Sequence, residues 1–223
     1  MKNLRKVLAL VLAVVMTVST FTVAFAAETE KTSGEILNAL GLAVGNENGD
    51  LMENETITRA EAAQIIVKVM NWDLESAESY TFEDTTWAKA QAATLVKKGI
   101  TVGVGNNKFG GADKMDALQV YAWAYAAITG TPAATASAYA DHSLLLEFFT
   151  ADEVAKLVAA KGTDAKRSEI FDGMKTILTT EVDGKTQLDR LIEAGKVDEA
   201  KAIELGLKEA PVTTNAIVSA ELL

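Results

Sequence analysis

The chain has 223 residues, a formal net charge of −10, one His and no Cys. The excess of acids excludes nucleic acid as a partner, because nucleic acid requires clustered Lys and Arg. Without Cys there are no disulfides or thiolate metal sites, and with a single His we expect no metal or other cofactor. Ala is abundant and only two residues are Pro, which favours helices.

The first 26 residues have the three parts of a secretory signal. A head with three cations (residues 2–6) precedes an apolar run (7–15), and the segment ends in Ala-Phe-Ala (24–26). A retained anchor is the alternative, but the strictly apolar run is shorter than the roughly 20 residues that cross a bilayer. We therefore predict export and no membrane insertion after cleavage. Loss of the three cations takes the formal net charge from −10 to −13.

Two stretches of the chain match at a constant offset of 58 residues. The matched pairs share apolar or glycine character: Leu37 with Leu95, Gly41 with Gly99, Leu42 with Ile100, Gly45 with Gly103, and Leu51 with Phe109. Apolar residues at i, i+3, i+4 and i+7 predict a helix after each stretch, over 58–70 and 114–128. A weaker third copy leads from 157–162 into a helix over 166–178. The sequence therefore predicts helix, glycine-rich loop and helix, three times.

These motifs resemble the S-layer homology module of bacterial surface proteins. Residues 57–61 read Ile-Thr-Arg-Ala-Glu, as in the I-T-R-A-E signature of that module. Residues 82–88 follow its F-x-D-x-x-x-W-A pattern, one residue short, and 98–109 follow its glycine-rich stretch. The likeness covers about residues 34–205.

The resemblance implies an all-α fold of three helix–loop–helix repeats in a pseudo-threefold arrangement around a central three-helix bundle. The expected organisation is a signal peptide (1–26), repeat 1 (27–78), repeat 2 (79–130), a degenerate repeat 3 (131–207) and a C-terminal tail (208–223).

The signature residues have a structural and a functional interpretation. Thr58 with Glu61 three residues later is a capping box, in which each side chain satisfies a backbone donor at a helix start. Arg59 in the first helical position opposes the dipole preference, which favours acids there, and beside exposed N–H groups it makes an anion receptor. Arg167 and Glu169 are the matching candidates in the third copy.

Further candidate binding residues lie in and around the second copy. Trp87 is either a sugar-stacking surface or a core residue. Asp84 is predicted to cap a helix that starts near Trp87. Gly103 is a loop glycine that supplies positive φ or close approach. In the second copy Met115 is aligned with the signature Arg and Ala117 with its Glu, so that copy is expected to keep its fold and lose its anion chemistry.

The resemblance implies a secreted protein of the cell wall or S-layer that binds non-covalently to an anionic, pyruvylated secondary cell-wall polysaccharide. Other surface proteins are additional candidate partners. The alternative is a protein–protein or envelope-organising module that has lost glycan binding. No enzyme is expected, since His142 is the single His and no nucleophile motif accompanies it.

Overall fold

The structure is a computed structural model that describes residues 30–79, 82–85, 87–131, 145–146 and 149–210. The predicted export signal, His142 and most of the predicted tail lie outside the described residues. The chain divides into two units, Met1–Lys31 and Thr32–Leu223, and every element below belongs to the second.

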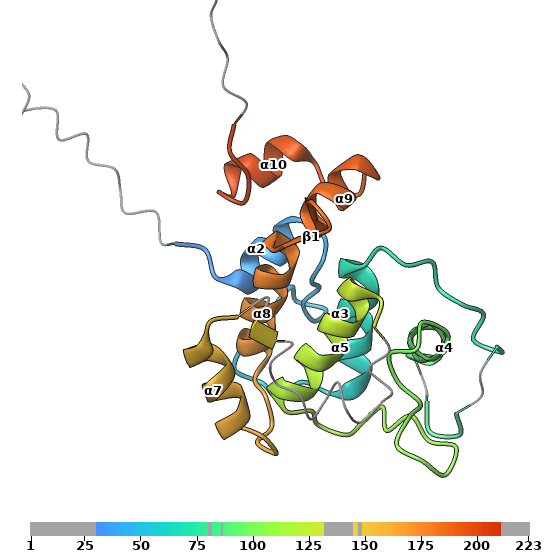
Figure 1. The fold of residues 1–223 in the computed structure, drawn as a ribbon. Coiled ribbons are helices and arrows are strands. Elements are labelled where there is room, and N and C mark those ends of the chain that lie inside the picture. The colour runs from blue at the N-terminus through green and yellow to red at the C-terminus, as the bar shows by residue number, and fades with distance from the viewer. Residues whose placement is uncertain (1–29, 80–81, 86, 132–144, 147–148, 211–223) are drawn as a thin grey trace, which may run out of the picture. The chain divides into compact units, whose positions relative to one another are not determined.

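The second unit is mostly helical, as the sequence predicted (Figure 1). Its described helices are α2 (Ser33–Ala39), α3 (Arg59–Val69), α4 (Lys89–Lys97), α5 (Ala117–Thr129), α7 (Ala151–Ala159), α8 (Arg167–Thr179), α9 (Gln187–Glu193) and α10 (Glu199–Glu204). In this part of the chain no helix is long and apolar enough to cross a membrane.

The described strands form one short antiparallel hairpin, β1 (Glu181–Val182) with β2 (Lys185–Thr186). Its turn residues, Asp183 and Gly184, both have positive φ. An Asp-Gly pair suits a two-residue hairpin turn because both central positions of a type I′ turn need positive φ. The sequence patterns did not predict this hairpin.

The predicted capping box at the start of α3 is confirmed. The Thr58 hydroxyl accepts a hydrogen bond from the Glu61 backbone N–H at 3.3 Å, and the Glu61 carboxylate accepts one from the Thr58 N–H at 2.8 Å. These contacts satisfy two backbone donors that the helix itself leaves unpaired. They fix where α3 begins, and so the direction in which its first turn points.

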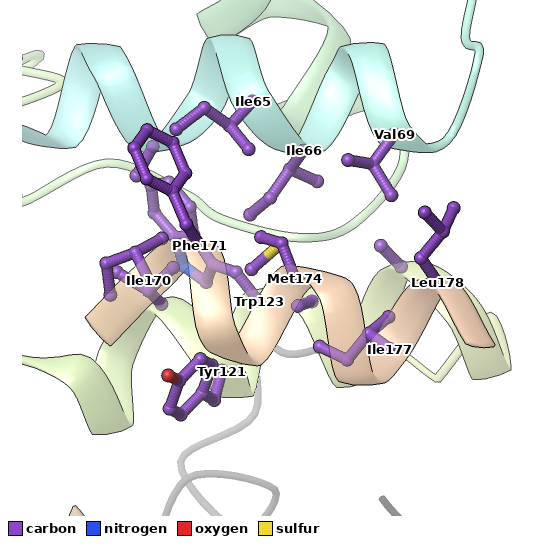
Figure 2. Close-up of a cluster of buried hydrophobic side chains, with 14 of the residues drawn as sticks. Ile65, Ile66, Val69, Tyr121, Trp123, Ile170, Phe171, Met174, Ile177 and Leu178 are labelled. Atoms are coloured by element: carbon purple, nitrogen blue, oxygen red, sulfur yellow. The ribbon is translucent and has the colours of Figure 1, made fainter. Parts of the chain in front are cut away.

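The core lies between α3, α5 and α8, and α5 packs against each of the other two (Figure 1). In Figure 2, Ile66 and Val69 of α3 point toward Met174 and Leu178 of α8, and all four side chains are buried. The apolar face predicted for α3 therefore packs against buried residues of α8. Burial of such side chains contributes about 1.5–3 kcal/mol each.

A closed ring of backbone hydrogen bonds joins the segments that enter these three helices. Ile57 N–H donates to the Ala165 carbonyl at 3.0 Å, Ala165 N–H to the Met115 carbonyl at 2.9 Å, and Met115 N–H to the Ile57 carbonyl at 3.3 Å. All three residues are buried. Because each of them lies two positions before a helix, the ring holds the three helix starts side by side.

The ring corrects the predicted alignment of Met115 with Arg59. Met115 is bonded in the same way as Ile57, and the N-cap of α5 is Asp116. The first helical residue of α5, the position that Arg59 and Arg167 have in α3 and α8, is therefore Ala117. Helix α5 still lacks a cation at its first position, but the residue that stands in place of the arginine is Ala117.

Candidate functional site

A groove runs beside α3 and consists of two adjoining parts, of about 510 Å³ and about 660 Å³. Both parts are lined by Met52, Glu61, Trp87 and Arg167. We call the two parts together the α3 groove. The first part continues past Thr58, Asp84 and Lys114, and the second past residues 44–47, Gln64 and Lys68.

Arg167 and Glu61 form an ion pair where the two parts meet. Arg167 is only 5% exposed, and its Nη1 lies 2.9 Å from Glu61 Oε1. Its Nε donates to the Leu51 carbonyl at 2.9 Å and its Nη2 to the Val44 carbonyl at 3.4 Å. A buried guanidinium requires such partners because desolvation of an unpaired charge is costly. Arg167 thus ties α8 to α3 and to the loop that precedes it.

Arg59 is the first residue of α3, and its guanidinium is hydrogen-bonded to other residues of this protein. Its Nε donates to the Phe109 carbonyl at 2.8 Å and its Nη2 to the Thr101 hydroxyl at 2.7 Å. The guanidinium also lies 4.4 Å from the centre of the Trp123 ring, a favourable cation–π distance. The described lining of the α3 groove does not include Arg59, so its role as a ligand residue stays a prediction.

Trp87 is exposed in the α3 groove, with 54% of its surface accessible. The alternative in which Trp87 is a core residue is therefore wrong. An exposed indole beside hydrogen-bonding groups is suited to recognition, because it combines a large apolar area with few rotatable bonds.

Asp84 does not cap a helix, contrary to the prediction. The N-cap of α4 is Ala88, without a side-chain hydrogen bond, whereas the two Asp84 oxygens accept from the N–H groups of Phe109 and Gly110, each at 2.8 Å. Partial loss of hydration raises the pKa of Asp84, but these two donors, together with its own N–H and nearby Lys108, outweigh it and hold the pKa below its ordinary value. Asp84 therefore holds in place the loop around Phe109, whose carbonyl accepts the hydrogen bond from Arg59.

The remaining predicted residues lie outside the groove lining. Gly103 has a φ of 83°, as predicted, and a Cβ there would meet the Lys108 carbonyl and the Phe82 ring. Glu169 accepts from the Lys166 N–H at 2.8 Å at the start of α8. The structure thus places Thr58, Glu61, Asp84, Trp87 and Arg167 in the groove lining, which does not include Arg59, Gly103 or Glu169.

Sequence reasoning missed Lys114 and Lys68 as groove residues. Lys114 is aligned with the start of a helix, so it carried no separate signal, and Lys68 is one cation on a surface with many. Glu55 lines the first part and Glu47 the second. Each part therefore holds one Lys and one Glu besides the Arg167–Glu61 pair, and the first part holds Asp84 as well.

The described residues define a mostly helical protein with an open polar groove, an exposed Trp in its wall and a buried ion pair at its centre. No protein-family model matches the chain. The chain is similar to the S-layer protein sap of Bacillus anthracis, with 25% identity over 170 residues, which cover 73% of this chain and 20% of that protein. It thus spans about a fifth of the length of this relative.

Proposed function

We propose that this chain is an S-layer-associated protein of the bacterial cell surface that binds secondary cell-wall polysaccharide non-covalently through the α3 groove. The observation that carries the proposal is the exposed face of Trp87 in a groove that also holds Lys114 and Arg167. An aromatic face can stack on the apolar face of a sugar, while the cations and the hydroxyl of Thr58 suit its acidic and polar groups. The similarity to an S-layer protein supports the same location.

The fold part of the proposal is an arrangement of three S-layer-homology-like repeats about a pseudo-threefold axis. The ring through Ile57, Met115 and Ala165 supports it. Matched arginine contacts support it as well: Arg59 Nε donates to the Phe109 carbonyl and Arg167 Nε to the Leu51 carbonyl. Leu51 and Phe109 are a pair in the 58-residue offset, so corresponding residues make corresponding bonds.

The ligand we propose is acidic, in agreement with the pyruvylated polymer that the family resemblance implies. With a formal charge of −13 after signal removal, the field of the whole protein repels an anion, and attraction must come from nearby cations. In the first part of the groove, Lys114 is the cation outside the Arg167–Glu61 ion pair, and it stands beside the carboxylates of Glu55 and Asp84. In this proposal the protein is exported, resides at the wall and acts by binding, without catalysis.

A second candidate is a protein–protein or envelope-organising module. It is favoured by the guanidinium of Arg167, which is buried and bonded to three protein groups, and by the presence of Ala117 at the first position of α5. Both features suit a fold that has retained the architecture of a glycan-binding module with fewer working sites.

Co-sedimentation with purified cell walls tests the two candidates. The walls would come from the bacterium that carries the gene, before and after acid extraction of the secondary polymer. We expect the protein to bind intact walls and to stay in solution with extracted ones. Equal binding to both preparations would overturn glycan binding and favour the second candidate.

Trp87→Ala is the decisive variant, and Leu74→Ala is its matched control. Leu74 is 52% exposed, close to the value for Trp87, and lies outside the groove lining. Loss of a central aromatic contact costs about 1–2 kcal/mol or more, which is roughly a tenfold loss of affinity. Wall binding by Trp87→Ala that equals binding by Leu74→Ala would show that the groove is not the site.

A further inference from the structure

We propose that the chain associates with further copies of itself, and that the apolar tip of the 99–111 loop of one copy enters a cavity between α7 and α8 of the next. We call residues 102–108 the loop tip. Neither the loop tip nor this cavity belongs to the described lining of the α3 groove. The contact is therefore independent of glycan binding.

The cavity has a volume of about 190 Å³ and apolar walls. The walls include the buried rings of Tyr121 and Phe149 and the half-buried side chain of Leu157. An apolar cavity of about 150 Å³ is large enough to hold benzene, so this one can hold a branched aliphatic side chain. The charged residues of its described lining are all exposed: Glu153, Glu169, Asp172 and Lys156. The cavity therefore has an acidic rim.

The cavity lies where the third copy of the sequence repeat is shortened. Helices α3 and α8 both begin with Arg, and their third, sixth, seventh and tenth residues line the second part of the groove and this cavity respectively. Beside α3 those positions share the lining with residues 44–47, which belong to the loop 42–58. The corresponding segment before α8 is only 163–166. The third copy thus has no residues of its own for such a loop.

The loop tip is a segment of the kind that is missing beside α8, because it belongs to the glycine-rich loop of the second copy. Its apolar side chains are unusually accessible, with Val102 66% and Val104 51% exposed. The Val104 N–H donates to the Lys108 carbonyl and the Lys108 N–H to the Gly105 carbonyl, each at 2.9 Å. A turn that is already hydrogen-bonded loses little conformational freedom on binding, and burial of its apolar side chains is favourable.

Charge favours the same pairing. Lys108 is exposed at the loop tip, whereas the described lining of the cavity holds three acids and one base. Two copies with a formal charge of −13 each repel one another at long range, so association requires local complementarity of this kind.

The two patches belong to opposite sides of the core. In Figure 1, α7 lies to the left of α3, α5 and α8, and α4, which leads into the 99–111 loop, lies to the right. A copy therefore does not fill its own cavity. A contact between two different patches of the same chain leaves one loop tip and one cavity free at the ends of every complex, so it builds open chains rather than a closed dimer.

Sedimentation velocity of variants that each carry one damaged patch tests the proposal. The full chain without residues 1–26 is used at increasing concentration. Val104→Asp damages the loop tip by placing a carboxylate against an acidic rim, and Asp172→Lys damages the rim. Both positions are exposed, so the fold should be retained. Leu74→Asp is the control, because Leu74 is 52% exposed and outside both patches.

We expect the parent and Leu74→Asp to associate equally, and each damaged variant alone to associate at least about tenfold more weakly. An equimolar mixture of Val104→Asp and Asp172→Lys should form a heterodimer, because one supplies an intact cavity and the other an intact loop tip. The double variant Lys108→Glu/Asp172→Lys should associate more strongly than either of its single variants. A parent that stays monomeric, a mixture that stays monomeric, or an equal loss in Leu74→Asp would overturn the proposal.

Discussion

The guanidinium of Arg167 lies 2.9 Å from the carboxylate of Glu61, although the two residues are 106 positions apart in the chain. The pair joins the first turn of α8 to the first turn of α3. Since Arg167 also donates to two loop carbonyls, one side chain connects three segments that line the α3 groove.

Arg167→Ala is therefore expected to destabilise the fold. It removes the partner of the Glu61 carboxylate, which is still 28% exposed. The free energy of unfolding should therefore fall by about 3 kcal/mol, near the lower end of the range of about 3–5 kcal/mol for broken buried ion pairs. Urea unfolding measures it. Lys89→Ala, at an exposed position on α4, should change the free energy of unfolding by less than about 0.5 kcal/mol. Equal stability of the two variants would contradict the role assigned to the pair.

Asp189 of α9 forms an ion pair with Lys208, which follows α10, and the strength of this contact depends on pH. The Lys208 ammonium donates to its carboxylate at 2.9 Å and the Thr186 hydroxyl donates at 2.7 Å, and together they lower the pKa of Asp189 from 3.8 to about 2. A lowered folded-state pKa gives stability that is present above the unfolded value and is lost as the pH falls through the folded value. Because the Asp189 side chain is 33% exposed, solvent screening limits the effect to about 1 kcal/mol or less.

Asp189→Asn should therefore lower the free energy of unfolding at pH 6 and differ little from the parent at pH 2. Denaturant unfolding from pH 2 to pH 6 measures this convergence. Glu193→Gln is the matched control, since Glu193 pairs with Lys185 at an exposed position and should have little effect at any pH. A constant difference between Asp189→Asn and the parent over the whole range would contradict the assigned pKa.

Gly173 lies within α8 where the ring of Tyr121 packs directly on the backbone. A Cβ at this position would overlap the Tyr121 ring. An Ala in place of Gly within a helix ordinarily stabilises it by about 1 kcal/mol, but here we expect Gly173→Ala to destabilise by about 1–3 kcal/mol, the usual cost of overpacking. Thermal unfolding measures the sign.

A double-mutant cycle separates overlap from any other effect of Gly173→Ala. In a Tyr121→Ala background the overlap is absent, so Gly173→Ala should cost much less there than in the parent. An equal cost in both backgrounds would show that the Tyr121 ring is not the cause.

Local sequence patterns predicted α3, α5 and α8, and they placed the start of α3 correctly because a capping box joins residues three positions apart. The same reasoning failed at Asp84, whose donors are 25 and 26 residues away. A carboxylate followed by a helix is consistent with a cap, and only the fold shows which N–H groups reach it. Trp87 had two open interpretations for the same reason, since exposure depends on segments far along the chain.

The misplaced alignment of Met115 had a signal that would have corrected it. Asp116 follows Met115 directly, and Asp is a preferred N-cap residue whereas Lys, at position 114, is not. The Asp116 carboxylate accepts from the Gln119 N–H at 2.8 Å. Alignment of Asp116 with Thr58 would have made Ala117 the counterpart of Arg59 from sequence alone.

Arg59 has a structural role that changes what its substitution is expected to do. The sequence alone suggested an anion receptor beside exposed N–H groups. Instead its guanidinium is bonded to the Phe109 carbonyl and the Thr101 hydroxyl and lies over the Trp123 ring. Hydrogen bonds from a charged group contribute about 1.5–3 kcal/mol each, and a cation–π contact adds about 0.5–1 kcal/mol. We expect Arg59→Ala to lower the free energy of unfolding by about 2–4 kcal/mol.

Thr101→Val tests that role because it removes the hydroxyl acceptor and keeps the shape of the side chain. In the parent it should cost about 1–2 kcal/mol, since a half-buried charged donor loses one of its partners. In an Arg59→Ala background the same change should cost clearly less, because only the hydrogen bond from the Gly103 N–H to the Thr101 hydroxyl is then lost, so the two substitutions should be non-additive in urea unfolding. If the costs of Arg59→Ala and Thr101→Val simply add, or if Arg59→Ala unfolds like the parent, the guanidinium does not hold α3 to the 99–111 loop.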